Sequence, residues 1–137
     1  MDYSVKSNFN GRSAQHSPKL VFNGQEGVLF QGDCLALLGN LLPDSVAMAF
    51  ADPPFNLGKN YGEAPFADQL ASEEYRKWCQ AWLLELVRVL RPGGALYLYH
   101  WPKGLMELGA WLNTIPTLDF RNWIAMKMKS GFPIKSR

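Results

Sequence analysis

Cysteine and charge are both scarce in this sequence of 137 residues. The two cysteines, Cys34 and Cys79, form no Cys-x-x-Cys pair, which argues against a disulfide framework and a thiolate metal site. Charged residues make up 19% of the chain and the net charge is +2, so the molecule as a whole is not a polycation. We therefore predict no metal site and a reducing, cytoplasmic setting.

Long apolar runs are missing as well. No run approaches the roughly 20 residues that a membrane-spanning helix needs, and no early segment joins a basic start to an apolar core. We therefore expect no contact with a membrane. The hydrophobic content of 47% is that of an ordinary globular protein, and the length suits one compact domain or a piece of a larger one.

The order of apolar and polar segments predicts an open α/β sheet. Residues 1–26 are polar without periodicity and are expected to form an irregular N-terminal arm. The continuous apolar run 45–51 is typical of a strand buried on both faces at the centre of a parallel sheet. Apolar patterns predict strands in 27–33, 45–51, 95–101 and 122–128, and helices over 34–41, 72–90 and 103–113. Alternating strands and helices favour mostly parallel strands flanked by helices.

The helix predicted over 72–90 has the clearest signals. Ser72 is a candidate cap, and acidic residues suit the first turn as basic residues suit the last. Pro92-Gly93-Gly94 is expected to end the helix. One face carries apolar and aromatic residues that we interpret as core: Tyr75, Trp78, Cys79, Trp82, Leu86, Val89 and Leu90.

Three polar features follow the predicted strands: Asp33, the segment Asp52-Pro53-Pro54-Phe55, and His100-Trp101. Ligand sites in open α/β sheets lie at the carboxyl ends of strands, so these features are expected to share one crevice. For Asp33 a helix-capping role is the alternative, and for His100 the alternative is a structural histidine at a strand end.

The segment 52–55 has the groups needed to hold an exocyclic amine of a nucleobase. Such an amine is a poor nucleophile because its lone pair is delocalised into the ring. The Asp52 carboxylate and the Pro53 carbonyl can each accept one amine hydrogen, and Pro54 stiffens the loop. Phe55 offers a flat face for stacking. A base inside a duplex is out of reach, so the substrate is expected to be flipped out or single-stranded.

These residues and their surroundings resemble the bacterial and phage DNA amino-methyltransferases. The resemblance is carried by "LFQGDCLALLGNLLPDSVAMAFA", by "DPPF" followed by "NLGKNY", by "LRPGGALYLYH" and by "WIAMKMKSGFP". It is nearest to the branch in which the catalytic motif precedes the glycine-rich cofactor motif. It implies a partial Rossmann-like sheet, S-adenosylmethionine as cofactor, double-stranded DNA as partner, and methyl transfer to the exocyclic amine of adenine, with cytosine as the open alternative.

Particular residues fall on the motifs of that family. Asp52, Pro53, Pro54 and Phe55 match its catalytic tetrapeptide, and Asp33 and Cys34 match its "GDC" turn beside the cofactor. The resemblance therefore implies catalysis by residues 52–55 and cofactor binding by Asp33, Cys34, Asp52 and Pro53. Lys59 and Tyr61 follow the tetrapeptide and are expected, with Phe55, to contact substrate.

The chain also departs from the family pattern. It has no Phe-x-Gly-x-Gly turn for the methionine part of the cofactor, and no region that reads the DNA sequence. Residues 27–137 are therefore expected to form an incomplete catalytic domain. Its missing strands leave an exposed sheet edge, so we expect a complementing polypeptide or a homodimer.

Two other functions remain open from the sequence. The chain can be a non-catalytic remnant, or a regulatory or DNA-binding subunit of a methyltransferase. It can also be a ribosomal RNA guanine N2-methyltransferase, although these have their glycine-rich turn upstream of Asp-Pro-Pro-Phe. From Arg121 to Arg137 five basic residues occur without an acid, which suits either a phosphate backbone or a solvated terminus.

Overall fold

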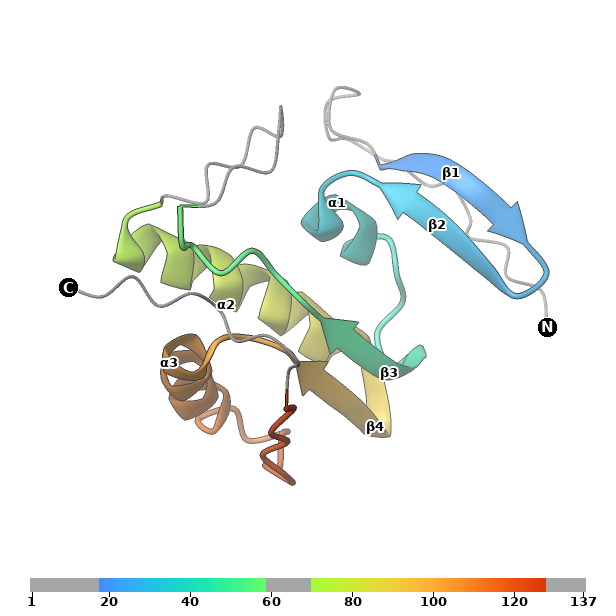
Figure 1. Cartoon of the computed structure of the whole chain (residues 1–137). Coiled ribbons are helices and arrows are strands. Elements are labelled where there is room, and N and C mark those ends of the chain that lie inside the picture. Colours follow the sequence, from blue (N-terminus) through green and yellow to red (C-terminus); the bar gives the residue numbers. More distant parts are fainter. Residues whose placement is uncertain (1–17, 59–69, 128–137) are drawn as a thin grey trace.

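The computed structural model describes residues 18–58 and 70–127 (Figure 1). Within these ranges, the elements in chain order are β1 (Lys19–Gly24), β2 (Gly27–Gln31), α1 (Cys34–Leu38), β3 (Val46–Ala51), α2 (Ser72–Val89), β4 (Leu90–Leu98) and α3 (Pro102–Leu112). The predicted α/β class is confirmed for the described part, which contains a parallel two-stranded sheet flanked by helices. No described helix combines the length and apolar character needed to cross a membrane.

The strands form two separate sheets. β3 and β4 pair in parallel and are joined by α2, as the alternation of elements predicted. β1 and β2 form an antiparallel hairpin, so the strand predicted at 27–33 exists but does not extend the parallel sheet. The prediction of an irregular arm was wrong for residues 19–24, because "KLVF" supplies apolar residues that pair across a two-residue turn.

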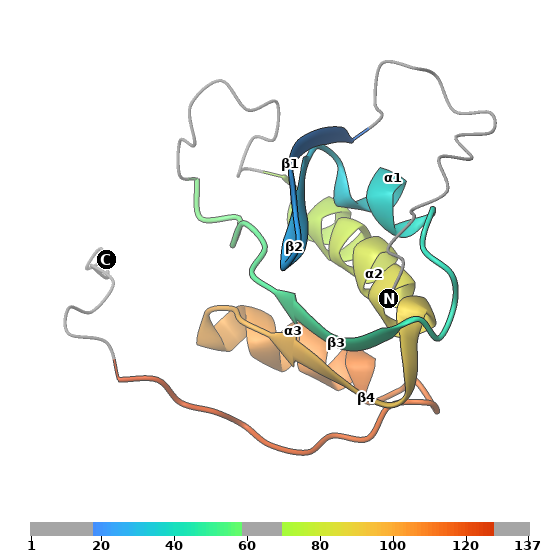
Figure 2. The same ribbon diagram turned by 90° about the vertical axis from the view of Figure 1, so that its right-hand side faces the viewer.

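The parallel sheet is covered on one face and exposed on the other. Ala51 pairs in register with Leu98, and both pack against the core that α2 and α3 contribute. The opposite face carries Met48, Phe50 and Tyr97, which are 59%, 65% and 44% exposed. Figure 2 shows the two strands with α2 and α3 beside them. The prediction that 45–51 is buried on both faces is therefore wrong for this chain by itself.

The core lies where α2 and α3 meet the sheet. Its buried members are Cys79, Trp82, Leu83 and Leu108, and the aromatic stripe of α2 packs there as predicted. Burial raises the pKa of the Cys79 thiol to about 11, against smaller opposing effects of Tyr75 and Trp82. The thiol is therefore protonated and serves as a small apolar group.

The ends of α2 differ from the prediction. Ala71 is the N-cap residue and Ser72 is already helical, so Ser72 does not cap the helix with its side chain. The helix ends at Val89, and Pro92-Gly93-Gly94 lies inside β4 rather than terminating the helix. Three extra residues on β4 enter the pairing between Val46 and Met48, and Gly93 has a φ of 76° there. A bulge of this kind needs a residue that tolerates the left-handed region.

The prediction of a strand over 122–128 was also wrong. Residues 122–127 have no regular secondary structure, and residue 128 lies outside the described part. Phe120, Trp123, Ile124 and Met126 are between 56% and 69% exposed. An apolar run becomes a strand by pairing with a neighbour, and these residues pair with no other described segment.

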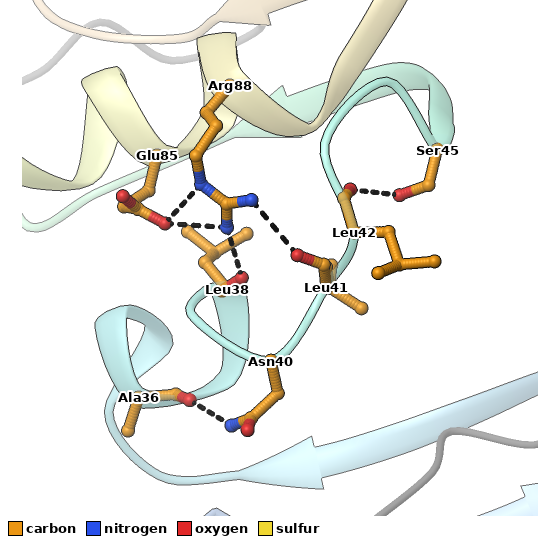
Figure 3. A network of polar contacts seen from close by, with 8 residues as sticks. All are labelled: Ala36, Leu38, Asn40, Leu41, Leu42, Ser45, Glu85 and Arg88. Carbon is orange, nitrogen blue, oxygen red and sulfur yellow. Dashed lines mark hydrogen bonds and ion pairs between the residues drawn. The ribbon is translucent and has the colours of Figure 1, made fainter. Parts of the chain in front are cut away.

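Arg88, on α2, links this helix to α1 through hydrogen bonds (Figure 3). Its guanidinium donates hydrogen bonds to the carbonyl oxygens of Leu38 at 2.8 Å and Leu41 at 3.0 Å, and it pairs with Glu85 at 2.8 Å. Carbonyls at the C-terminal end of a helix lack partners within the helix. Arg88 therefore gives the Leu38 carbonyl a second donor beside the Leu41 amide, and it satisfies the Leu41 carbonyl in the loop after α1.

Replacing Arg88 by methionine is expected to destabilise the fold by about 2 kcal/mol, the scale of hydrogen bonds to a charged donor. Methionine preserves much of the aliphatic stem but none of the donors. The free energy of unfolding from urea titration is the measurement. Glu85→Gln is the matched control, because it weakens the ion pair and leaves the bonds to Leu38 and Leu41. An equal loss of unfolding free energy in both variants would show that the ion pair with Glu85, and not the bonds to the two carbonyls, provides the stabilisation.

Candidate active site

The segment 52–55 leaves the carboxyl end of β3 where β4 also ends. The amide of Tyr99 donates a hydrogen bond to the carbonyl of Ala51 at 2.8 Å, which continues the parallel ladder by one step. The residues after the two strands therefore start side by side. Asp52 is exposed and Pro53 is half-buried at this edge. The expected position of the tetrapeptide at a strand end is confirmed.

Phe55 packs against the segment that follows β4. Its ring stacks on the His100 imidazole with a centroid distance of 4.6 Å and an interplanar angle of 30°. Tyr99 contacts Phe55 in a tilted arrangement at 5.8 Å. Offset aromatic contacts at these distances stabilise a ring orientation beyond simple burial. Two of the three predicted polar features thus meet at the strand ends.

Tyr75 joins the same cluster from the first turn of α2. Its hydroxyl donates a hydrogen bond to the Pro54 carbonyl at 2.6 Å and lies 2.7 Å from Nε2 of His100. The sequence pattern predicted Tyr75 as a core residue, and its ring does pack against the core. Its polar role was missed, because helical periodicity reports which face a residue occupies and not what its hydroxyl contacts.

His100 is 5% exposed, although it lies at the edge of the sheet. Desolvation lowers the pKa of its imidazole below the ordinary value of 6.5, against smaller opposing effects of the Trp101 backbone and the Asp52 and Glu107 carboxylates. The ring is therefore neutral near pH 7. Its Nδ1 is buried and has no hydrogen-bond partner in the described part of the chain.

Asn56 was not singled out in the sequence, yet it anchors the loop that follows the tetrapeptide. Its side-chain amide donates to the Leu70 carbonyl and accepts from the Leu70 amide, both at 2.8 Å. Its φ is 57°, a region that asparagine tolerates better than most residues. Asn56 thus ties the two ends of the segment that holds Lys59 and Tyr61, which themselves lie outside the described residues.

Asp33 caps a helix in this structure. Its carboxylate accepts a hydrogen bond from the Leu35 amide at 2.9 Å at the start of α1. The neighbouring Cys34 is exposed, and its thiol pKa is raised by partial burial and by the charge of Asp33. These contacts belong to α1, and a role of either residue beside a cofactor stays a prediction.

The described residues match the part of a methyl-transfer site that holds the nucleobase better than the part that binds the cofactor. Asp52, Pro53 and Phe55 lie at the strand ends, and Phe55 stacks on His100. Asp33 is engaged in its cap, and the chain has no Phe-x-Gly-x-Gly turn. No group of three or more histidine, cysteine or acidic residues in the described ranges is arranged to bind a metal ion.

The sequence of the chain matches a known protein family. Residues 46–137 match the model of a family described as DNA methylase. The chain belongs to this DNA methylase family. The matched range contains the tetrapeptide as well as Tyr75 and His100, whereas Asp33 and Cys34 precede it.

Individual relatives of the chain are curated methyltransferases. It is 44% identical over 119 residues to Type II methyltransferase M.BamHI of Bacillus amyloliquefaciens, covering 87% of this chain and 27% of the relative. It is 31% identical over 103 residues to Type II methyltransferase M.HpaI of Haemophilus parainfluenzae, covering 75% and 32%. It is 28% identical over 116 residues to DNA adenine methyltransferase YhdJ of Escherichia coli (strain K12), covering 85% and 33%. The chain therefore spans about a third or less of the length of these relatives.

Proposed function

We propose that this chain supplies the amine-holding part of an S-adenosylmethionine-dependent DNA methyltransferase that modifies the exocyclic amine of a flipped base. The observation that carries the proposal is the position of Asp52 and Phe55 at adjoining strand ends, with Phe55 stacked on His100. Adenine is the proposed target rather than cytosine. The name of YhdJ, a DNA adenine methyltransferase, supports this choice by similarity alone.

The proposed mechanism uses the carboxylate of Asp52 and one backbone carbonyl as acceptors for the two amine hydrogens. The Pro53 carbonyl is the proposed second acceptor, and the neighbouring Pro54 carbonyl accepts from the Tyr75 hydroxyl. Together the acceptors turn the nitrogen lone pair away from the ring, and Phe55 holds the base plane. S-adenosylmethionine supplies the methyl group when bound. Orientation and charge stabilisation then provide most of the rate enhancement.

The remaining site assignments belong to the same proposal. Asp33 and Cys34 are proposed to adjoin the cofactor with Asp52 and Pro53, as the family motif implies. Lys59 and Tyr61 are proposed to contact DNA from the loop that Asn56 closes.

A complementing polypeptide is the proposed partner besides DNA. The support is the sheet face of Met48, Phe50 and Tyr97, which is apolar and exposed in this chain. Parallel sheets are normally covered on both faces. Analytical ultracentrifugation of the isolated chain is the check: a monomer without self-association would count against an open apolar face, whereas a dimer would identify a second copy as the cover.

A non-catalytic subunit of a methyltransferase is the second candidate. One observation favours it: Asp33 is used as a helix cap. Such a subunit retains the fold and its contacts with DNA or with a partner methyltransferase, and transfers no methyl group.

An exchange protein separates the two candidates. In it, the segment of M.BamHI that matches this chain is replaced by the matching residues of this chain, which are 44% identical over 119 positions. After circular dichroism confirms folding, S-adenosylmethionine is titrated into the exchange protein and into the isolated chain by calorimetry. We expect saturable binding by the exchange protein and weaker binding by the isolated chain. A folded exchange protein without binding would contradict the catalytic proposal.

A further inference from the structure

Residues outside the tetrapeptide determine how it is held. Tyr75 comes from α2 and His100 follows β4, and both contact the tetrapeptide, at the Pro54 carbonyl and the Phe55 ring. The two side chains also contact each other at 2.7 Å. The Pro54 carbonyl is thereby linked to the Phe55 ring through the side chains of Tyr75 and His100.

The direction of the hydrogen bonds follows from the groups involved. A carbonyl only accepts, so the single hydroxyl hydrogen of Tyr75 is directed to Pro54. The Tyr75 oxygen must then accept from Nε2 of His100. The neutral imidazole therefore carries its hydrogen on Nε2, and the buried Nδ1 is bare.

Gly104 makes room for this imidazole. It lies in the first turn of α3 and is buried. A Cβ built on it would overlap the Nδ1 and Cε1 atoms of His100 and would lie 2.9 Å from Nε1 of Trp101. Any side chain at this position would therefore displace the His100 ring. Gly109, five residues later in the same helix, would place its Cβ in open space.

We propose that Tyr75, His100 and Gly104 form a positioning unit that fixes the Pro54 carbonyl and the plane of the Phe55 ring for a stacked nucleobase with an exocyclic amine. Through this unit, α2 and α3 determine the orientation of the loop at residues 52–55. The two prolines stiffen this loop but do not orient it. None of the three residues needs to touch the reacting atoms. The inference rests on the proposed function for its substrate, but its geometry can be tested without one.

The first measurement is nitrogen NMR of the full chain with labelled histidine. The chain has two histidines, and His16→Gln assigns the signals. We expect His100 to be the neutral Nε2–H tautomer and to titrate below pH 6.5. The titratable groups facing it are Asp52 after β3, Tyr75 on α2 and Glu107 on α3. An Nδ1–H tautomer of the neutral ring would overturn the positioning unit.

Two variants perturb the unit from different helices. Tyr75→Phe removes the hydroxyl and should shift the His100 tautomer signals and the Phe55 ring resonances. Gly104→Ala should shift the same resonances by displacing the imidazole, and Gly109→Ala is its control. Both glycine variants gain helix propensity, so a difference between them reports the contact with His100. If Gly104→Ala does not fold, Tyr75→Phe alone tests the inference. Unchanged His100 and Phe55 resonances in Tyr75→Phe would overturn it.

The functional readout is binding of a short single-stranded oligodeoxyadenylate, followed at the Phe55 resonances. Tyr75→Phe should weaken binding on the order of three- to tenfold, the scale of one hydrogen bond. Gly109→Ala should bind like the original chain. Equal affinity in Tyr75→Phe would overturn the positioning role. If the original chain itself does not bind, the proposed base-stacking function fails, and the tautomer measurement still decides the geometry.

Discussion

Asp52→Asn is expected to abolish methyl transfer by the exchange protein, with a rate loss of about 10²–10³-fold or more. Asparagine keeps the shape and one acceptor oxygen of aspartate. It loses the negative charge that stabilises the amine nitrogen as it gains positive character, and its own N–H groups oppose the amine hydrogens. Transfer of radiolabelled methyl from S-adenosylmethionine to DNA is the measurement.

Asp44→Asn is the matched control for this loss. Asp44 lies at the opposite end of β3, is exposed, and has a φ of 56° that asparagine also tolerates. The control should transfer methyl at the original rate, and both variants should bind S-adenosylmethionine as the unmodified exchange protein does. Undiminished transfer by Asp52→Asn would remove Asp52 from the mechanism.

Leu83→Ala is expected to give a large loss of stability for a single truncation in α2. Leu83 is 0% exposed and belongs to the cluster in which α2 meets α3 and the sheet. Truncation of a buried leucine removes favourable burial and leaves a cavity, which together cost about 2–5 kcal/mol. The free energy of unfolding of the full chain from urea denaturation is the measurement.

The neighbouring residue provides the control for that experiment. Leu84 is 50% exposed and lies on the other side of the same helical turn. Leu84→Ala should change the free energy of unfolding by less than about 1 kcal/mol, because surface substitutions away from special contacts have small effects. Similar losses at both positions would mean that α2 is covered on both sides, by a second copy or by contacts of residues outside the described ranges.

Short-range patterns predicted the parts of the fold that depend on neighbouring residues. The apolar stripe of α2, the helix over 102–112 and the strand before Asp52 were found close to where the sequence placed them. A helical face recurs every three to four residues and a strand needs a short apolar run, so both signals are local. The exposed position of Asp52 directly after a strand follows from the same reasoning.

Other features required knowledge of distant partners. The contact between Tyr75 and His100 joins residues 25 positions apart in the sequence, and periodicity carries no information about it. The apolar run at 122–127 has the composition of a strand but no described neighbour to pair with. The bulge at Gly93 was interpreted as a helix stop, because a left-handed glycine serves both purposes. The use of Asp33 as a cap was one of two alternatives that local sequence could not separate.

The most direct test of the account is nucleoside mass spectrometry of DNA treated with the exchange protein and S-adenosylmethionine. The account predicts a new methyl group on an exocyclic amine, as N6-methyladenine, that disappears with Asp52→Asn. N4-methylcytosine instead would keep the amine-holding role of Asp52 and overturn the choice of adenine. Unmodified DNA, from an exchange protein that binds both S-adenosylmethionine and DNA, would contradict the central claim that Asp52 and Phe55 hold a base for methyl transfer.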